Sequence, residues 1–166
     1  SPRVRKFEKF GTRPYRSIEQ LVNSKWYTSA IDIWAVGCIF AEFFNRERIF
    51  PFESEIDMIV GIFDICGRPV YPDLPHVNPL VKEILSQLPK KKKRNRLRQF
   101  IHRQMPNDAY DLLTRFLTYN PAYRITAKAA LNHKYFASAT NSYNSFSMSM
   151  FLKEYTWFYI CPYYST

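Results

Sequence analysis

The segment YTSAIDIWAVGCIFAEFFNRERIF constrains the fold more than any other part of the chain. Apolar residues repeat at helical spacing along one side, at Ile31, Trp34, Ala35, Cys38, Ile39 and Phe43, and the other side carries Ile33, Val36, Phe40 and Phe44. A helix that is apolar almost all round must be buried on every face. We therefore expect a central helix from about Ser29 to Asn45, with Ser29 and Asp32 as its capping pair.

A second helix is predicted to follow, because Ser54 and Asp57 form another capping pair and Gly67 and Pro69 supply a stop. Its apolar stripe consists of Ile56, Ile59, Val60 and Phe63. Prolines and then basic residues interrupt 68–106, where only one short helix is expected, around Leu80 to Leu88.

Two more helices are predicted towards the C-terminus. Asn107 caps the first, Pro121 closes it, and its apolar face consists of Ala109, Leu112, Leu113, Phe116 and Leu117. Thr126 caps a last short helix in TAKAALNHKYF. No strand is predicted, so the fold class is mainly α.

Composition narrows the class of protein. A chain of 166 residues that is 46% hydrophobic allows one domain with a sizeable core. The three cysteines, Cys38, Cys66 and Cys161, are far apart and lack metal-ligand spacing, which favours a reducing compartment, the nucleus or cytoplasm. No apolar run is long enough for a membrane span, and the N-terminal residues do not form a signal peptide. The Ser-rich and aromatic residues 137–166 are expected to lie outside the domain.

Four motifs occur in a fixed order: GTRPYRSIEQL, YTSAIDIWAVGCIFAE, RIFPFESEID and NPAYRITAKAALNHKYF. In that order they resemble the C-lobe of a eukaryotic protein kinase, and most closely the group of cyclin-dependent and mitogen-activated kinases. Cdc7-type kinases, which share the G-T-R start, are the second choice. The resemblance implies an incomplete kinase domain over residues 1–136, a mainly α C-lobe that starts inside the activation segment.

The resemblance also implies roles for particular residues. Glu19 ends the motif A-P-E, here Ser17-Ile18-Glu19, and is expected to form a buried ion pair with Arg124. Asp32 is expected to accept hydrogen bonds from the backbone of the catalytic loop, with a plain helix-start carboxylate as the alternative. Thr12 and Arg16 would shape the peptide site. Arg16 would face the residue after the phosphoacceptor and support a preference for proline.

The residues of phosphoryl transfer are not in this sequence. It has no G-x-G-x-x-G, H-R-D or D-F-G motif, and family order places all of them upstream of Gly11. We therefore predict no catalytic residue and no metal ligand here, and expect ATP and magnesium only in a full-length kinase. The chain alone is predicted to be inactive. The alternatives are a non-catalytic interaction module that resembles a pseudokinase, and a basic nucleic-acid-binding protein.

The net charge of +10 and the run of basic residues point to an acidic partner. The run consists of Lys90, Lys91, Lys92, Lys93, Arg94, Arg96 and Arg98. It is read as a solvated insert, as a signal for an import receptor, or as a docking patch. Nucleic acid fits less well, because the run lacks interleaved aromatic residues for stacking. The other expected partners are a protein substrate and a cyclin-like or other activating subunit. No membrane is expected.

Overall fold

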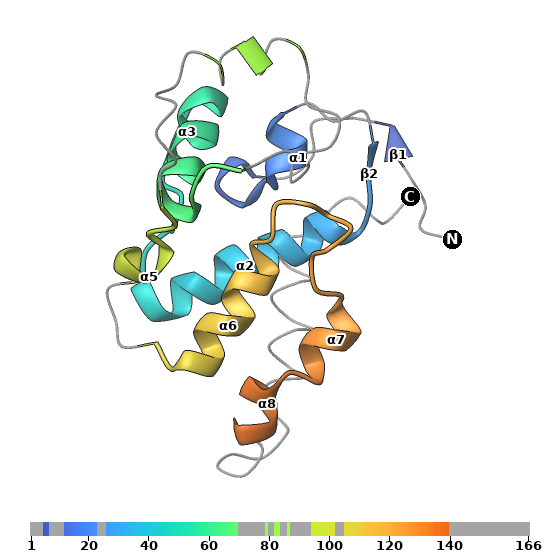
Figure 1. Ribbon diagram of the computed structural model, residues 1–166, viewed down its shortest axis with the longest axis vertical. Helices are drawn as coiled ribbons and strands as arrows, with labels where there is room; N and C mark the ends of the chain where they lie inside the picture. The colour runs from blue at the N-terminus through green and yellow to red at the C-terminus, as the bar shows by residue number, and fades with distance from the viewer. Residues whose placement is uncertain are drawn as a thin grey trace. The chain divides into compact units, whose positions relative to one another are not determined.

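The computed structural model describes two-residue strands at Arg5–Lys6 and Trp26–Tyr27, residues 12–22, 28–69, 94–101 and 105–139, and the isolated positions 79, 82, 83 and 86. In chain order the elements are β1 (Arg5–Lys6), η1 (Arg13–Tyr15), α1 (Ile18–Leu21), β2 (Trp26–Tyr27), α2 (Ala30–Asn45), α3 (Glu55–Cys66), α5 (Leu97–Phe100), α6 (Asn107–Phe116), α7 (Ala127–Leu131) and α8 (Lys134–Ala139), as Figure 1 shows. The predicted mainly α class is confirmed.

The strands β1 and β2 pair antiparallel, with Arg5 opposite Tyr27 and Lys6 opposite Trp26. No strand was expected from the sequence pattern. Two residues are too few for the alternation of apolar and polar side chains that identifies a strand.

Helix α2 occupies the predicted position, but its start and its burial differ from the prediction. Ser29 stands at the N-cap position, but it has helical dihedral angles and its side chain makes no capping hydrogen bond, so the predicted hydroxyl cap is wrong. The Ala30 N–H instead donates to Thr28 Oγ1 over 3.3 Å. At the other end Arg46 takes a left-handed φ of 61° and donates its N–H to Glu42 O, which closes the helix.

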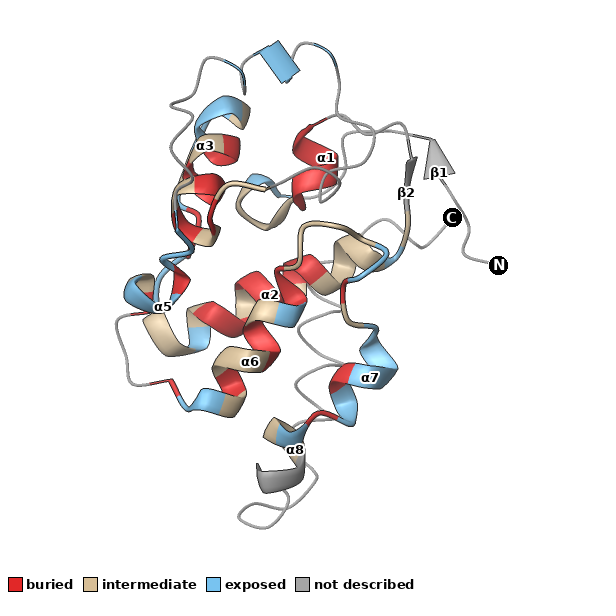
Figure 2. Cartoon of the chain, viewed as in Figure 1, coloured by how far each residue is buried: buried red, intermediate tan, exposed pale blue. Residues whose placement is uncertain are grey.

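One side of α2 is buried, and this side forms the core of the first part of the chain (Figure 2). Its buried residues are Trp34, Ala35, Gly37, Cys38, Phe40 and Ala41. The predicted burial on every face is wrong for the described residues, because Phe43 is 49% exposed and the side chains of Ile31, Ile33, Val36, Ile39 and Phe44 are half-buried. Helix α6 and η1 pack against α2.

Helix α3 begins as predicted. Ser54 Oγ accepts a hydrogen bond from the Asp57 N–H over 3.0 Å and donates one to Asp57 Oδ2 over 2.6 Å. Ile59 and Phe63 of the predicted stripe are buried as expected, but Ile56 is 52% exposed, and Met58 and Ile62, which were not predicted, are fully buried. Apolar residues surround most of this helix, so periodicity alone does not select the face that packs against α1 and α5.

Helix α6 buries the predicted face of Ala109, Leu112, Leu113 and Phe116, and Leu117 just beyond it is also buried. Asn107 is the first helical residue and not the cap; Pro106 precedes it, and no side-chain cap is present. The helix expected around Leu80 to Leu88 falls mostly outside the described residues, although positions 79, 82, 83 and 86 are helical.

Contacts divide the chain into two units, Ser1–Ile125 and Thr126–Thr166. In the second unit Thr126 Oγ1 accepts from the Ala129 N–H over 3.2 Å, which confirms the predicted cap of α7. The single last helix that was predicted is two helices. α7 ends at Leu131, and His133 Nδ1 accepts from the Tyr135 N–H at the start of α8. In the residues that the structure describes, no helix is long and apolar enough to cross a membrane.

Two glycines inside helices provide a matched test of how closely these elements pack. A Cβ at Gly37 would lie 2.7 Å from the Cβ of Phe116, next to the backbone of α6. One at Gly61 would lie 2.0 Å from Cε2 of Phe52, and this half-buried side chain must turn away, whereas no backbone has to move. Alanine favours a helix over glycine by about 1 kcal/mol at either position. We expect Gly37→Ala to lower the free energy of unfolding by about 1–3 kcal/mol relative to Gly61→Ala, because the α2–α6 backbones must separate. Urea unfolding followed by circular dichroism measures this, and equal stabilities would contradict the close α2–α6 approach.

Candidate functional site

The centre of the first unit is an ion pair between Glu19 on α1 and Arg124, in the turn that follows α6. It is bidentate: Arg124 NH1 donates to Glu19 Oε1 over 2.7 Å, and NH2 donates to Glu19 Oε2 over 2.9 Å. The two side chains are 0% and 6% exposed. The structure thus brings together two residues, 105 positions apart, that the resemblance paired.

The guanidinium of Arg124 uses all five of its N–H donors. NH1 also donates to Ala30 O over 2.6 Å, NH2 to Tyr119 O over 3.2 Å, and Nε to Thr118 O over 2.9 Å. Its carbon lies 5.1 Å from the centre of the Trp34 ring. A buried charge is stable only when its hydrogen-bonding groups are satisfied, and here each donor fixes another segment of backbone or side chain.

The residues before Glu19 lack the proline of A-P-E, and hydrogen bonds hold this segment in its place. The Ser17 N–H donates to Gln20 Oε1 over 3.0 Å, and the Ser17 hydroxyl to the same oxygen over 3.2 Å. Ile18, where the family has proline, is fully buried. The role of Gln20 was not predicted, although Ser17 and Gln20 have the spacing of a capping box.

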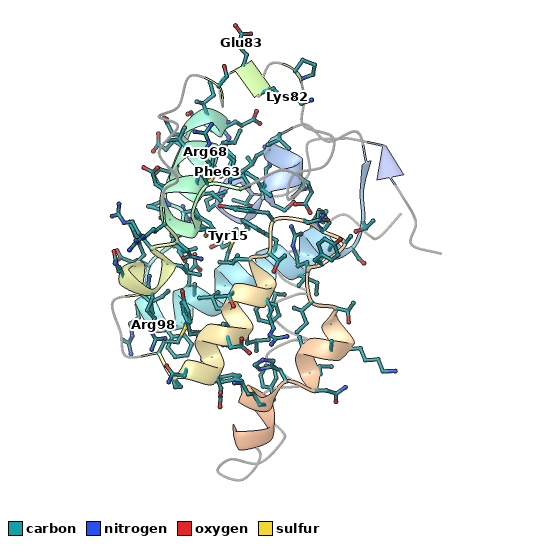
Figure 3. The ribbon with its side chains drawn as sticks, viewed as in Figure 1. Tyr15, Phe63, Arg68, Lys82, Glu83 and Arg98 are labelled. Atoms are coloured by element: carbon teal, nitrogen blue, oxygen red, sulfur yellow. The ribbon has the colours of Figure 1, made fainter. Side chains whose placement is uncertain are left out.

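Tyr15 joins the same segment to α2, in an interaction that sequence analysis missed. Its hydroxyl lies 3.1 Å and 3.2 Å from the two carboxylate oxygens of Glu42. Tyr15 is labelled in Figure 3 and belongs to η1, which packs against α2. Burial raises the pKa of the Tyr15 phenol and the Glu42 carboxylate raises it further, so the hydroxyl stays protonated as the donor.

Arg16 and Thr12 flank this anchored turn. Arg16 NH1 lies 3.2 Å from Glu55 Oε1 at the start of α3, and the two side chains are 15% and 36% exposed. Thr12 is exposed, and its carbonyl accepts from the Tyr15 N–H over 3.1 Å. Arg13 NH1 donates to Glu53 O, which ties the same turn to the segment before α3. The roles predicted for Thr12 and Arg16 concern a bound peptide and stay predictions.

Asp32 and the basic run complete the predicted set. Asp32 lies in the first turn of α2 and is half-buried, and its role towards a catalytic loop stays a prediction. Lys90, Lys91, Lys92 and Lys93 lie outside the described residues, whereas Arg94, Arg96 and Arg98 are described and exposed. Among the described His, Cys, Asp and Glu residues, no group of three or more is arranged to hold a metal ion.

Comparisons with known proteins agree with the resemblance seen in the sequence motifs. The model of the protein kinase domain family matches residues 2–136. The chain is 39% identical to mitogen-activated protein kinase 1 of Oryza sativa subsp. japonica over 127 residues, which cover 76% of the chain and 31% of the relative. It is 40% identical to mitogen-activated protein kinase 3 of Arabidopsis thaliana over 127 residues, 76% of the chain and 34% of the relative. The chain therefore spans about a third of the length of these curated relatives.

Among solved structures, the chain is similar to a MAP kinase of Leishmania major. The TM-score is 0.68 and the sequence identity is 29%, and the match covers 76% of this chain and 41% of that one.

Removing one partner of the buried pair should be far more damaging than removing one of a surface pair. Glu19→Gln leaves the Arg124 charge buried without its carboxylate, and we expect a loss of about 3–5 kcal/mol in the free energy of unfolding. The control is Asp111→Asn, which breaks the 3.2 Å pair with the 55% exposed Arg115 and should cost about 0.5 kcal/mol or less. Urea unfolding of both variants measures the difference, and similar losses would contradict the anchoring role of Glu19.

The Tyr15–Glu42 contact predicts a dependence of stability on pH. Burial raises the pKa of Glu42 from its ordinary 4.5, against the opposing effects of the Tyr15 hydroxyl and Arg48. The folded chain therefore binds this proton more tightly than the unfolded chain, and stability falls as pH rises from 4.5 through the raised value. Glu42→Gln keeps an acceptor for Tyr15 but does not titrate.

The free energy of unfolding of the wild-type chain, relative to Glu42→Gln, should consequently decrease as the pH rises above the ordinary carboxyl pKa of 4.5. Urea unfolding at stepped pH, with tyrosine and tryptophan fluorescence as the signal, gives this difference. A difference that stays constant, or that grows in favour of the wild type with rising pH, contradicts the burial of Glu42.

Proposed function

We propose that this chain, which belongs to the protein kinase family, takes part in binding the substrate. The model of the protein kinase domain matches residues 2–136. Within that family the chain is the C-terminal portion of a MAP kinase-like serine/threonine kinase domain. The predicted resemblance to the cyclin-dependent and mitogen-activated group is confirmed. This group was the first choice, ahead of the Cdc7-type kinases.

In the proposed function this portion presents the peptide substrate and forms the C-lobe scaffold of a kinase that phosphorylates serine or threonine in proteins. The observation that carries the proposal is the anchoring of the turn from Thr12 to Glu19. Tyr15 binds Glu42 on α2, and Glu19 binds Arg124 beyond α6. A loop fixed at both points keeps a constant shape, which lowers the conformational entropy that a bound peptide would otherwise have to offset.

Arg16 supports the finer proposal that the kinase is proline-directed. Its guanidinium is mostly buried and directed at Glu55, so that its side chain closes one side of the anchored turn. Proline has no backbone N–H and therefore loses nothing where a pocket offers its amide no acceptor. Any other residue would leave an N–H unpaired there, at a cost of about 1–3 kcal/mol.

Catalysis itself is assigned to other parts of a longer kinase. The chain contains no G-x-G-x-x-G, H-R-D or D-F-G motif, the sequence motifs with which the family binds ATP and magnesium. In this proposal the chain alone transfers no phosphate. An activating subunit of the cyclin type, or another regulator, is a proposed partner of the longer kinase.

A paired-peptide assay on the longer kinase that contains this chain tests the proposal. Arg16→Ala should lower the ratio of kcat/KM for matched Ser-Pro and Ser-Ala peptides by about tenfold, the low end of the discrimination that an unpaired amide provides. Lys128→Ala, which removes an exposed cation of α7, is the control and should leave the ratio unchanged.

The kinase function and the role of Arg16 can be refuted separately. A longer protein that phosphorylates no serine or threonine peptide would refute the kinase function. A kinase whose Ser-Pro to Ser-Ala ratio is the same in the wild type and in Arg16→Ala would refute only the role of Arg16.

A further inference from the structure

A cavity of about 250 Å³ lies in the first unit, where the end of α3, α5 and the end of α6 meet. The described residues that line it include Cys66, Leu97, Thr114, Leu117, Asn120 and Tyr123. Leu97 and Leu117 are buried and form an apolar floor, while Tyr123 is 77% exposed. Burial raises the pKa of the Cys66 thiol to about 12, so at neutral pH its sulfur adds to the apolar lining.

The start of α5 is fixed beside this cavity by backbone contacts. The Arg96 N–H donates to Ile65 O over 2.8 Å, which ties α5 to the last turn of α3. Asn95 Oδ1 accepts from the Leu97 N–H over 2.8 Å, and both residues line the cavity. The side chains that α5 carries are therefore held at a constant distance from the cavity.

Two arginines of this segment are held in place by aromatic rings. The guanidinium carbon of Arg96 lies 5.2 Å from the centre of the Phe100 ring, and that of Arg98 lies 4.8 Å from the Tyr110 ring on α6. Arg98 also donates to Asn107 Oδ1 over 3.3 Å, and Figure 3 shows it beside α5 and α6. Neither arginine pairs with a carboxylate among the residues that the structure describes.

An arginine stacked on an aromatic ring keeps the N–H donors at the edge of its guanidinium plane available for a carboxylate. Because the rings already restrict both side chains, less conformational entropy is lost when an anion binds. In the sequence, four consecutive lysines, Lys90 to Lys93, directly precede these arginines. Among the described residues, Arg96 and Arg98 flank Leu97, which lines the cavity, so positive charge lies next to it.

We propose that this cavity and its arginines, Arg96 and Arg98, form a docking site for an acidic peptide segment that carries one apolar anchor residue. The anchor side chain enters the cavity, and neighbouring aspartate or glutamate residues pair with the arginines. This site is additional to the peptide site of the proposed kinase and does not depend on phosphoryl transfer. It supplies the acidic partner that the charge of the chain indicates.

A peptide fits these features better than nucleic acid. Single-stranded nucleic acid gains much of its affinity by stacking bases on exposed aromatic rings. Here the rings of Phe100 and Tyr110 already contact arginines, and both are half-buried. The buried floor of Leu97 and Leu117 suits an aliphatic or aromatic side chain of a peptide.

The test measures binding of a fluorescent twelve-residue peptide with one central leucine flanked by glutamates, to the 166-residue chain at low and at physiological salt. Arg96→Glu/Arg98→Glu should weaken binding by about tenfold or more, since two exposed charge pairs become repulsive. Arg115→Glu reverses one exposed charge elsewhere on α6 and is the control, expected to change the affinity by about twofold or less. Circular dichroism verifies that each variant is folded.

Two further comparisons test the cavity. Replacing the leucine of the peptide by serine should weaken binding, and so should Tyr123→Ser, which removes an exposed side chain of the rim and leaves the core intact. The proposal is overturned by unchanged affinity of the double variant, by equal losses in Arg115→Glu, or by an anchor replacement without effect. Tighter binding of a single-stranded oligonucleotide, or of phosphatidylserine vesicles, overturns it in favour of a general polyanion surface.

Discussion

The arrangement of the first unit depends on one buried cation. Arg124 is 0% exposed at its side chain, and its five donors reach α1, the start of α2 and the two residues Thr118 and Tyr119 beyond α6. A buried pair of this kind adds little net stability compared with an apolar equivalent, since desolvation offsets most of the attraction. What it contributes is uniqueness: a shift of any of these segments leaves an unpaired charge or donor in a medium of low polarity. The position of the turn from Thr12 to Glu19 is therefore fixed by the need to keep Arg124 paired.

The anchored turn also shows how a family motif tolerates substitution. Proline at the first helical position restricts φ and has no N–H to satisfy. In this chain Ile18 stands there, and the restriction comes from the Gln20 side chain, which accepts from both the Ser17 N–H and the Ser17 hydroxyl. Proline restricts φ already in the unfolded chain, whereas these hydrogen bonds restrict the backbone only once the chain has folded. The unfolded chain is therefore less restricted, whereas the folded position of Glu19 is maintained.

How much the sequence could predict depended on the range of the interactions involved. The extent of α2 and the caps at Ser54 and Thr126 follow from local patterns, and the order of four motifs predicted the family. The caps at Ser29 and Asn107 were wrong because capping requires a particular backbone conformation at one residue, which residue type does not fix. The Tyr15–Glu42 contact joins residues 27 apart with no pattern between them. Such contacts become visible only when the packing of η1 on α2 is known.

Trp34 explains why the cation can be buried at this point. The centre of its ring lies 6.2 Å from the ring centre of Phe50 and 6.2 Å from that of Tyr119, and both rings are nearly parallel to it. The guanidinium carbon of Arg124 lies 5.1 Å from the Trp34 ring centre. Trp34 Nε1 is buried and has no hydrogen-bond partner among the described residues. An orphaned donor of this type costs about 1–3 kcal/mol, so the ring is placed by its faces and not by its N–H. The face of the Trp34 ring carries partial negative charge, so it stabilises the guanidinium where water is excluded. If the ring turned to give its N–H a partner, this contact with the guanidinium would be lost.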